Sequence, residues 1–315
     1  MMKGHKALWL ENTLLRLAIL PEKGADIPLL FHLPSGVQFL MQTPHGLQSP
    51  NQYPQMDFLE NYEGGWQELL PNCSDACQVQ NISFPVHGEA ALLSWEHEIP
   101  GEYELHLWVN CRLSPFRLER WMRLNQDTLE VTGQVINSGE QEWPFVWGNH
   151  IALGGDFLED GCRLEMPANK IATPAIQSEP GSSRLADAQW EDWPMGRGRQ
   201  PGEVFDLRYI PGPQTRSHDD AFITGFSTGH VDVTNPRLKL RFNLDWDAAV
   251  FPWLTLWMPY GGVEQAPIKG TYGVGIEPWV YRGNLTEAIK AGQARSLGPG
   301  ESLTTQLTIK IEIAE

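Results

Sequence analysis

Three ionisable side chains lie in segments rich in glycine and aromatic residues, where a ligand could reach them. His87 precedes a glycine, His150 follows the sequence Trp-Gly-Asn, and Glu277 lies in the uncharged run Val-Gly-Ile-Glu-Pro-Trp. Imidazole titrates near neutral pH and can take up or release a proton during a reaction. A carboxylate in an apolar run must be paired, hydrogen-bonded or held at raised pKa, because burying an unpartnered charge is costly. These groups could perform acid–base chemistry, although such residues are more often structural.

A fourth segment, Ser217–Phe222, contains the adjacent acids Asp219 and Asp220. Neighbouring residues of a strand point to opposite faces, so one acid is expected to face a ligand and the other solvent. A carboxylate has two acceptor oxygens and can bind the vicinal hydroxyls of a sugar. The alternative is that the two acids belong to a turn.

The aromatic content also favours a sugar as ligand. The chain has 13 tryptophans, and aromatic faces suit the apolar C–H faces of sugars, while polar side chains suit their hydroxylated rims. Most of these tryptophans are expected in the core. Trp279, beside Glu277, is expected in a pocket wall, and the amide of Asn149 could orient a ligand beside His150.

The elements that would position these residues are mainly β-strands. Alternation of apolar and polar residues predicts strands over 105–110, 129–135, 238–244 and 307–313, since successive side chains of a strand point to opposite faces. Helical periodicity is scarce; the clearest helix is predicted over 285–291, capped by Asn284 or Thr286 and ended by Gly292. The 30 glycines and 24 prolines are typical of a large antiparallel β-sandwich with many turns and loops. A parallel βαβ architecture is not expected.

Two long stretches, 43–75 and 179–213, have the composition of loops. Long loops inside a compact domain are more often functional than not. Neither stretch is of low complexity, and similar strands flank both. We therefore interpret residues 1–315 as a single all-β domain; a division into two domains near 180–213 is the alternative.

The charge balance constrains the partners. The 23 basic and 39 acidic residues give a formal net charge of −16, which repels phosphate backbones and anionic lipid headgroups. Residues 24–111 contain eleven acids and no Lys or Arg. This segment could be a solvated acidic face, a binding surface or, less commonly, a site for a hard cation. We expect a neutral small molecule as partner, and neither nucleic acid nor a membrane.

Targeting features and cysteine usage favour a cytoplasmic protein. No apolar stretch approaches the roughly 20 residues of a membrane-spanning helix, and residues 1–10 lack the apolar region of a signal peptide. The spacing Cys73-x3-Cys77 is a weak zinc motif without a second ligand pair. With Cys111 and Cys162 the cysteines number four, too few and too scattered for a disulfide framework. We expect reduced, mostly buried thiols.

Taken in order, these segments resemble the aldose 1-epimerases of the galactose mutarotase-like superfamily. The resemblance covers most of the chain, and the fold it implies is the large antiparallel β-sandwich called a supersandwich. The matching elements are a strand pair over 14–33, His87-Gly88, Asn149-His150, Asp219-Asp220-x-Phe222 and Gly275-Ile276-Glu277-Pro278.

The resemblance also implies a mechanism. Glu277 would be the base that removes the proton of the anomeric hydroxyl, and His150 the acid that protonates the ring oxygen. The ring then opens, the C1–C2 bond rotates, and closure from the other face gives the other anomer. His87 would polarise the anomeric end, and Asp219 would bind sugar hydroxyls, unless Asp220 takes that place. No metal, organic cofactor or nucleophile is required.

One departure from the family pattern concerns the substrate. Galactose mutarotases carry an arginine upstream of the first histidine, and residues 24–111 contain none. The loop over 62–72 resembles instead the Gly-Gly-Trp loop of other epimerase-like branches. There Trp66 and Gln67 could line a pocket for another neutral sugar, or Trp66 could merely pack beneath the loop. Galactose itself is therefore left open.

Two functions other than epimerisation of a neutral monosaccharide are also compatible with these residues. One is a non-catalytic protein that binds or senses a sugar. The other is a carbohydrate hydrolase or lyase, in which Asp219 and Glu277 would flank the bond. The combination of His87, His150 and Glu277 favours the epimerase, because a binding module needs no opposed acid and base. The sugar, the anomer and the oligomeric state are not determined by the sequence.

Overall fold

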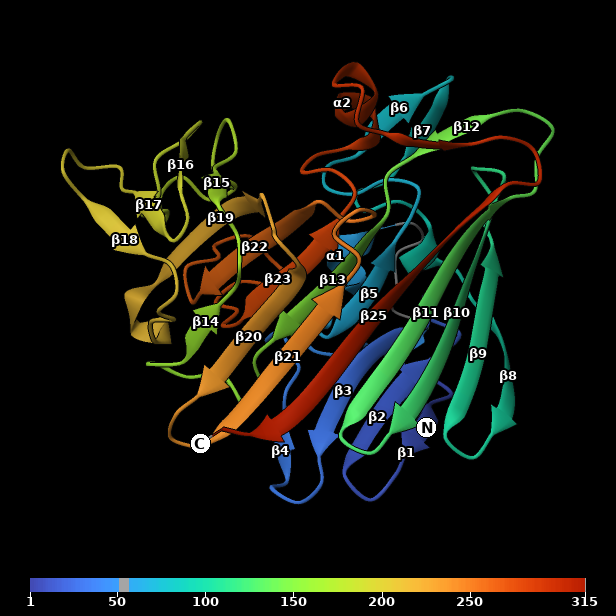
Figure 1. Ribbon diagram of the computed structural model, residues 1–315, viewed down its shortest axis with the longest axis horizontal. Coiled ribbons are helices and arrows are strands. Elements are labelled where there is room, and N and C mark those ends of the chain that lie inside the picture. Colours follow the sequence, from blue (N-terminus) through green and yellow to red (C-terminus); the bar gives the residue numbers. More distant parts are fainter. Residues whose placement is uncertain (51–56, 315) are drawn as a thin grey trace.

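Two antiparallel sheets dominate the computed structural model, which describes residues 1–50 and 57–314 (Figure 1). The larger, with 11 strands, has the order β1-β2-β3-β5-β13-β23-β22-β19-β15-β16, and β4 pairs with β3. The second sheet, with eight strands, has the order β14-β20-β21-β25-β11-β10-β9-β8. In Figure 1 the second sheet lies in front of the large one. The predicted all-β, antiparallel class is confirmed.

The strands of both sheets are mostly short, and the chain crosses repeatedly between the sheets. The large sheet contains β1 (Leu8–Glu11), β2 (Leu15–Leu20), β3 (Asp26–His32), β4 (Val37–Gln38), β5 (Trp66–Leu69), β13 (Gly148–Leu153), β15 (Lys170–Ala172), β16 (Trp190–Asp192), β19 (Ser217–Thr224), β22 (Trp253–Tyr260) and β23 (Val274–Trp279). The second sheet contains β8 (Glu96–Gly101), β9 (Glu104–Asn110), β10 (Phe116–Asn125), β11 (Thr128–Asn137), β14 (Arg163–Glu165), β20 (Gly229–Asn235), β21 (Leu240–Trp246) and β25 (Ser302–Ile313).

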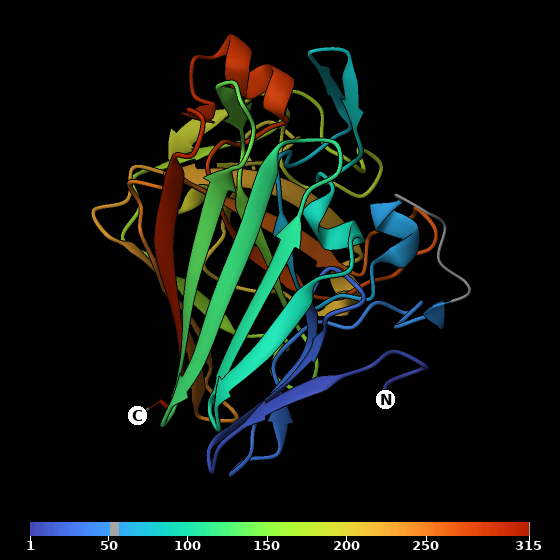
Figure 2. The same cartoon turned by 90° about the vertical axis from the view of Figure 1, so that its right-hand side faces the viewer.

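Smaller elements lie around these sheets. Three two-stranded ribbons pair β6 (Cys77–Val79) with β7 (Ile82–Phe84), β12 (Trp143–Phe145) with β24 (Arg295–Leu297), and β17 (Met195–Arg197) with β18 (Val204–Asp206). The helices are α1 (Phe58–Asn61), α2 (Leu285–Lys290) and the 3₁₀ turns η2 (Ala90–Leu92) and η3 (Pro213–Thr215). Helix α2 and the β6–β7 ribbon lie at one end of the molecule, and both chain termini lie toward the other (Figures 1 and 2).

The strands predicted from alternation form where expected. Residues of β11 alternate between buried and half-buried along its length, and β9 and β25 also cover their predicted segments. Strand β21 begins at Leu240, two residues later than predicted, because Lys239 takes a positive φ of 53° in the preceding turn. Helix α2 is confirmed too. Asn284 and Glu287 form a reciprocal capping box at its start.

The large sheet has an inner and an outer face. Arg120 on β10 of the second sheet donates to Glu68 Oε2 on β5 at 3.4 Å, so Trp66 and Glu68 of β5 point inward, between the sheets. The alternate residue Gln67 and its partner His150 on β13 point to the outer face. Side chains on the inner face form part of a large cluster of buried apolar residues. The outer face carries the candidate site.

The stretches predicted as loops contain strands, of which β5 and β16 belong to the large sheet and β17 and β18 form a ribbon. Strand β5 lies within 43–75, and β16, β17 and β18 lie within 179–213. All four residues of β5 are buried, including a glutamine and a glutamate, so no apolar–polar alternation reveals it. The prediction of loop was wrong there, and β5 lies directly beside β13 in the sheet.

Two further features bear on the expected environment. No helix within 1–50 or 57–314 is long and apolar enough to cross a membrane. The four cysteines are free thiols, with Cys73 and Cys162 buried and Cys77 and Cys111 partly so.

Candidate active site

The outer face of the large sheet brings His150 and Glu277 together. Their strands β13 and β23 are neighbours, paired at Gly148↔Trp279 and Ala152↔Gly275, which places His150 opposite Glu277. His150 Nε2 lies 3.6 Å from Glu277 Oε1. A proton could therefore pass between the imidazole and the carboxyl with little movement.

Gly275 gives the carboxyl its room. A Cβ atom at this position would lie 2.2 Å from Glu277 Oε1 and 3.0 Å from Cβ of Trp257. Any larger side chain would have to displace the carboxyl from beside His150. The glycine that precedes Glu277 by two residues is thus explained by close approach, since both residues point to the same face of β23.

Aromatic rings enclose the imidazole of His150. Tyr62, just after α1, places its hydroxyl 3.5 Å from His150 Nδ1, and the ring centroids of Phe58 and Trp257 each lie 5.7 Å from that of His150. His150 is only 5% exposed and Glu277 only 1%. The pair therefore lies in a largely apolar environment, in which charge separation is costly.

Burial shifts both pKa values toward the neutral forms. It lowers the pKa of His150 to about 4. Burial, with the nearby charge of Asp220, raises the pKa of Glu277 well above its ordinary value. Both shifts therefore favour a neutral pair that holds one proton, on the carboxyl. That is the same number of protons as in an ionised pair with a carboxylate and an imidazolium.

His87 stands next to this pair in a constrained conformation. Its φ of 61° is positive, an uncommon value for a residue with a side chain. The backbone N–H of Ser74 donates to His87 Nδ1 at 3.1 Å, so the neutral ring carries its proton on Nε2 and can donate from there. Burial, and then the proximity of His150, lower the pKa of His87 well below its ordinary value. Its ring centroid lies 5.3 Å from that of His150.

Of the predicted sugar-binding residues, Gln67 and Trp279 share the outer face with the pair. Gln67 is the register partner of His150, and Trp279 follows Glu277 by two residues on β23. The ring of Trp279 lies 5.8 Å from that of His87 in an edge-on arrangement. Both side chains are therefore positioned beside the acid–base pair.

Trp66 and Asn149 lie on the inner face instead. Trp66 Nε1 donates to Asn149 Oδ1 at 3.0 Å, and Arg120 lies over the Trp66 ring. Each precedes an outer-face residue by one position, so strand alternation sends it to the opposite side. The structure differs from the sequence-based expectation here: these two residues contact each other on the inner face and do not line the outer face.

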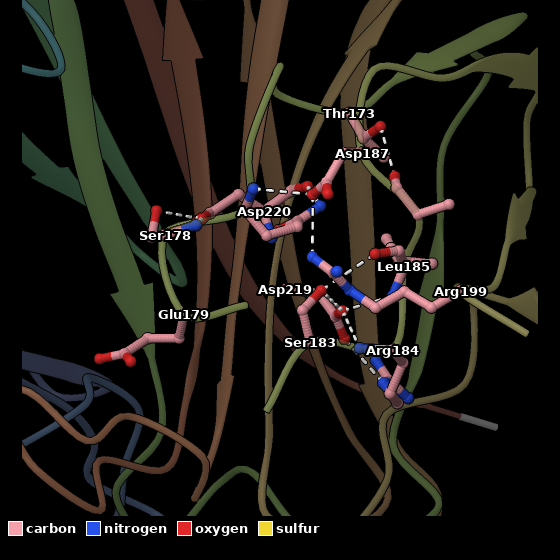
Figure 3. Close-up of polar contacts among 12 residues, drawn as sticks. Thr173, Ser178, Glu179, Ser183, Arg184, Leu185, Asp187, Arg199, Asp219 and Asp220 are labelled. Carbon is pink, nitrogen blue, oxygen red and sulfur yellow. Dashed lines mark hydrogen bonds and ion pairs between the residues drawn. The ribbon is translucent and has the colours of Figure 1, made fainter. Parts of the chain in front are cut away.

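Asp219 also lies on the inner face, because its neighbour Asp220 is in register with the outer-face residue Trp257; Figure 3 shows its contacts with 183–185. Its Oδ1 accepts from Ser183 Oγ and from the backbone N–H groups of Arg184 and Leu185, at 2.7 to 2.9 Å, and its Oδ2 accepts from Arg184 Nε at 2.7 Å. The carboxylate is fully buried and both oxygens are in use. It holds the segment 183–185 against β19, contrary to the expectation that it binds a ligand.

The neighbouring acid Asp220 takes the outer-face position that was expected for one of the two. Its register partner is Trp257, which in turn pairs with Gly275. Ser178 Oγ donates to Asp220 Oδ2 (Figure 3), and His218 Nε2 lies 3.9 Å from Oδ1. Its charge is close enough to raise the pKa of Glu277.

Several polar atoms around the pair have no hydrogen-bond partner among the described residues. They are Gln67 Oε1, Glu277 Oε1, Thr255 Oγ1 and Trp279 Nε1, all buried. Thr255 is the register partner of Glu277 on β22. Unpartnered buried polar groups are costly, and here they form a set of donors and acceptors that a hydroxylated ligand could satisfy.

Phe58, Tyr62 and Thr255 were not identified from the sequence, and Asp220 was named only as the alternative to Asp219. For Thr255 and Asp220 the alternation of β22 and β19 could have given the face, but only once the register with β23 was known. Phe58 and Tyr62 lie within the stretch interpreted as loop, and no pattern in the sequence links them to His150. Their roles depend on contacts between distant segments.

The acidic segment 24–111 has largely internal partners. Lys23, one residue before it, contacts both Asp26 and Glu63, Arg120 contacts Glu68, and Glu89 accepts from backbone N–H groups of 112–114. Within 1–50 and 57–314, no group of three or more His, Cys, Asp or Glu residues is placed to hold a metal ion.

The arrangement of the two sheets is shared with known structures. Slr1438 from Synechocystis sp. PCC 6803 is 18% identical with a TM-score of 0.73, covering 99% of this chain and 98% of its own. A candidate aldose 1-epimerase from Klebsiella pneumoniae is 16% identical with a TM-score of 0.71, covering 96% and 77%. A galactose mutarotase-like protein from Lactobacillus casei is 15% identical with a TM-score of 0.65, covering 98% and 100%. The fold is therefore galactose mutarotase-like.

The family itself follows from the sequence match. Residues 2–311 match the family described as a domain of unknown function, DUF4432. The chain belongs to this family. No curated protein matches the chain.

Proposed function

We propose that this protein is an aldose 1-epimerase that interconverts the anomers of a monosaccharide. The observation that carries the proposal is the buried pair of His150 and Glu277, 3.6 Å apart, in which burial favours a state with one proton. Ring opening of an aldose needs one proton removed from the anomeric hydroxyl and one delivered to the ring oxygen. A pair that shares one proton meets both needs without net uptake or release.

In the proposed mechanism, Glu277 accepts the proton of the anomeric hydroxyl and His150 donates one to the ring oxygen. This requires the proton of the resting pair to lie on His150. Sugar hydroxyls that donate to the unpartnered Glu277 Oε1 would stabilise the carboxylate and lower the pKa of Glu277. Substrate binding would thereby prepare the ionised pair. After rotation about C1–C2, the same two groups would reverse the transfers and close the ring.

The neighbouring side chains would bind and orient the sugar. Gln67, Thr255 and Trp279 offer buried polar atoms that have no partner among the described residues, and a sugar hydroxyl can both donate and accept. His87, with its proton on Nε2, would donate near the anomeric end. Asp220 would accept from hydroxyls on the β19 side. The apolar enclosure by Phe58 and Tyr62 would exclude water and strengthen these interactions.

The test is exchange spectroscopy of the two anomers for a panel of aldoses, with and without the protein. We expect the wild type to accelerate interconversion of one or more aldoses, and Glu277→Gln to lower that acceleration by about 10²- to 10⁴-fold, the usual contribution of a general acid or base. Glu165→Gln, an exposed strand residue of the second sheet, is the matched control and should retain activity.

A different result would favour another function. If no aldose interconverts faster while one or more bind in a direct titration, the catalytic assignment is wrong. A non-catalytic sugar-binding protein would then be the better account, because the unpartnered polar atoms would still explain binding.

A further inference from the structure

Arg282 is a cation on the outer face that has no part in the mechanism above. It lies between β23 and α2, and its Cζ atom is 5.4 Å from the ring centroid of Trp253, 5.5 Å from that of Trp190 and 5.9 Å from that of Phe222. The guanidinium is half-buried among these three rings. Such stacking fixes the position of a cation.

Arg282 differs from the other arginines that stack on aromatic rings. Arg282 forms no ion pair or hydrogen bond with any residue within 1–50 or 57–314. The others each contact a carboxylate: Arg16 with Glu11, Arg117 with Glu119, Arg120 with Glu68, Arg163 with Glu165 and Arg184 with Asp219. Arg282 is thus stacked in the same way as these arginines but lacks a carboxylate partner among the described residues.

The register of the sheet places Arg282 at the far end of the proposed sugar site. Glu277 pairs with Thr255, and Thr255 pairs with Phe222, so the three lie in one row on the outer face. Neighbouring strands are about 4.8 Å apart, which puts the backbone of Phe222 roughly 10 Å from that of Glu277. A sugar with its anomeric carbon at Glu277 can therefore extend toward Arg282.

The chemistry of the arrangement suits an oxyanion. The three aromatic rings surround the guanidinium without offering it an acceptor oxygen, which leaves its N–H groups as donors. Two parallel N–H groups match two oxygens of a carboxylate, phosphate or sulfonate. Trp190, which is 55% exposed, keeps this end of the face open to solvent. A neutral hydroxyl would use fewer of these donors and leave the charge uncompensated.

We propose that Arg282 binds an anionic group carried by the sugar substrate, on the side away from the anomeric carbon. The proposal rests on the epimerase function for its anomeric chemistry, and it replaces the neutral sugar with one that bears a carboxylate, phosphate or sulfonate. The net charge of −16 does not oppose this, because solvent-exposed charges farther than about 8 Å are largely screened at physiological ionic strength.

The test compares each neutral hexose with anionic counterparts in the anomer-exchange assay. Glucose and galactose would be measured beside their 6-phosphates, their uronates and their 6-deoxy-6-sulfonates, which distinguishes the three kinds of anion. We expect kcat/KM for one kind of anion to exceed that for the neutral hexose by roughly 10- to 100-fold, as a charge-assisted bidentate pair provides. In Arg282→Gln this ratio should fall to about one.

Two further variants separate binding of the anion from a structural role of the side chain. Arg282→Lys keeps the positive charge but loses the two parallel N–H donors of the guanidinium. We expect an intermediate ratio of kcat/KM for the anionic sugar to that for the neutral sugar. Arg163→Gln removes a stacked but paired arginine of β14, and we expect the wild-type ratio. If Arg282→Gln lowers kcat/KM for neutral and anionic sugars equally, or if the wild type prefers neutral sugars, the anion proposal is wrong even though the epimerase function stands.

A binding measurement keeps the two proposals distinguishable if no sugar is turned over. Tryptophan fluorescence would be titrated with the 6-phosphates, the uronates, the 6-deoxy-6-sulfonates and inorganic phosphate, since Trp190 and Trp253 lie against Arg282. A saturable change for one or more of these probes in the wild type and in Arg163→Gln, absent in Arg282→Gln, would support the anion site although catalysis had failed. No saturable change with any of them in the wild type would overturn it.

Discussion

Each face of the large sheet buries a carboxyl group, and the two groups differ in how many hydrogen-bond partners they have. On the inner face Asp219 accepts four hydrogen bonds, including one from the guanidinium of Arg184. On the outer face Glu277 is equally buried, has an imidazole 3.6 Å away and retains an oxygen with no partner among the described residues. The first arrangement stabilises the fold. The second leaves an unfavourable group in place, which is typical of sites that bind or react.

This difference predicts the largest effect at Asp219, where the cost is to stability. We expect Asp219→Asn to lower the free energy of unfolding by about 3 kcal/mol, because it leaves Arg184 half-buried without its charge partner. Urea denaturation would measure it. The folded fraction should still accelerate anomer exchange, since Asp219 faces away from the pair. Loss of turnover in fully folded Asp219→Asn would contradict the separation of the two faces.

Glu277→Gln should show the reverse pattern, with activity lost and stability kept or gained. The pKa of Glu277 is raised in the folded protein, so the neutral carboxyl contributes stability below the unfolded pKa, and this contribution is lost as the pH rises through the folded pKa. Glutamine cannot ionise. The melting temperature of Glu277→Gln relative to wild type should therefore increase from pH 4.5 to pH 8. A difference that stays constant over this range would contradict a neutral, buried Glu277.

The pH profile of catalysis should be bell-shaped, because the pair works only when it holds one proton. Below a pH of about 4, the pKa of His150, both groups are protonated and no base is present. Above the raised pKa of Glu277, both are deprotonated and no acid is present. We expect kcat/KM to fall tenfold per pH unit beyond each limit. Exchange spectroscopy from pH 3.5 to 10 would show it, and a profile that does not fall below pH 4 would contradict the shared-proton arrangement.

A smaller effect distinguishes the neighbouring residues Trp66 and Gln67. We expect Gln67→Leu to raise KM by about tenfold, since it removes a polar group beside His150, and to lower the free energy of unfolding by about 1 kcal/mol, because Gln67 Nε2 no longer donates to the carbonyl of Gly64. Trp66→Phe should lower the free energy of unfolding by a similar amount, because its hydrogen bond to Asn149 is lost, but should leave KM unchanged. KM values and urea denaturation of both variants would check this. Equal effects on KM would contradict the assignment of Trp66 to the inner face.

Part of the site could be predicted from local sequence. In strands with clear alternation, such as β11 and β25, the sequence pattern predicted which side chains are buried. The glycine-rich surroundings of His150 and Glu277 indicated that these two residues could take part in acid–base chemistry. The start of α2 was predicted to within two residues, with Asn284 or Thr286 as the cap, and the structure shows Asn284 in a capping box with Glu287. These features depend on residues close together in the chain.

The sequence by itself determined the all-β class and the residue types for proton transfer, since both depend on local pattern and side-chain chemistry. The tertiary structure alone decided which member of each neighbouring pair faces the site: His150 over Asn149, Gln67 over Trp66, and Asp220 over Asp219. A shift of one residue exchanges the two faces of a strand, and the register is fixed by pairing of segments more than a hundred residues apart, such as β13 with β23. The same long-range packing left Arg282 stacked on three rings without a carboxylate from the described chain.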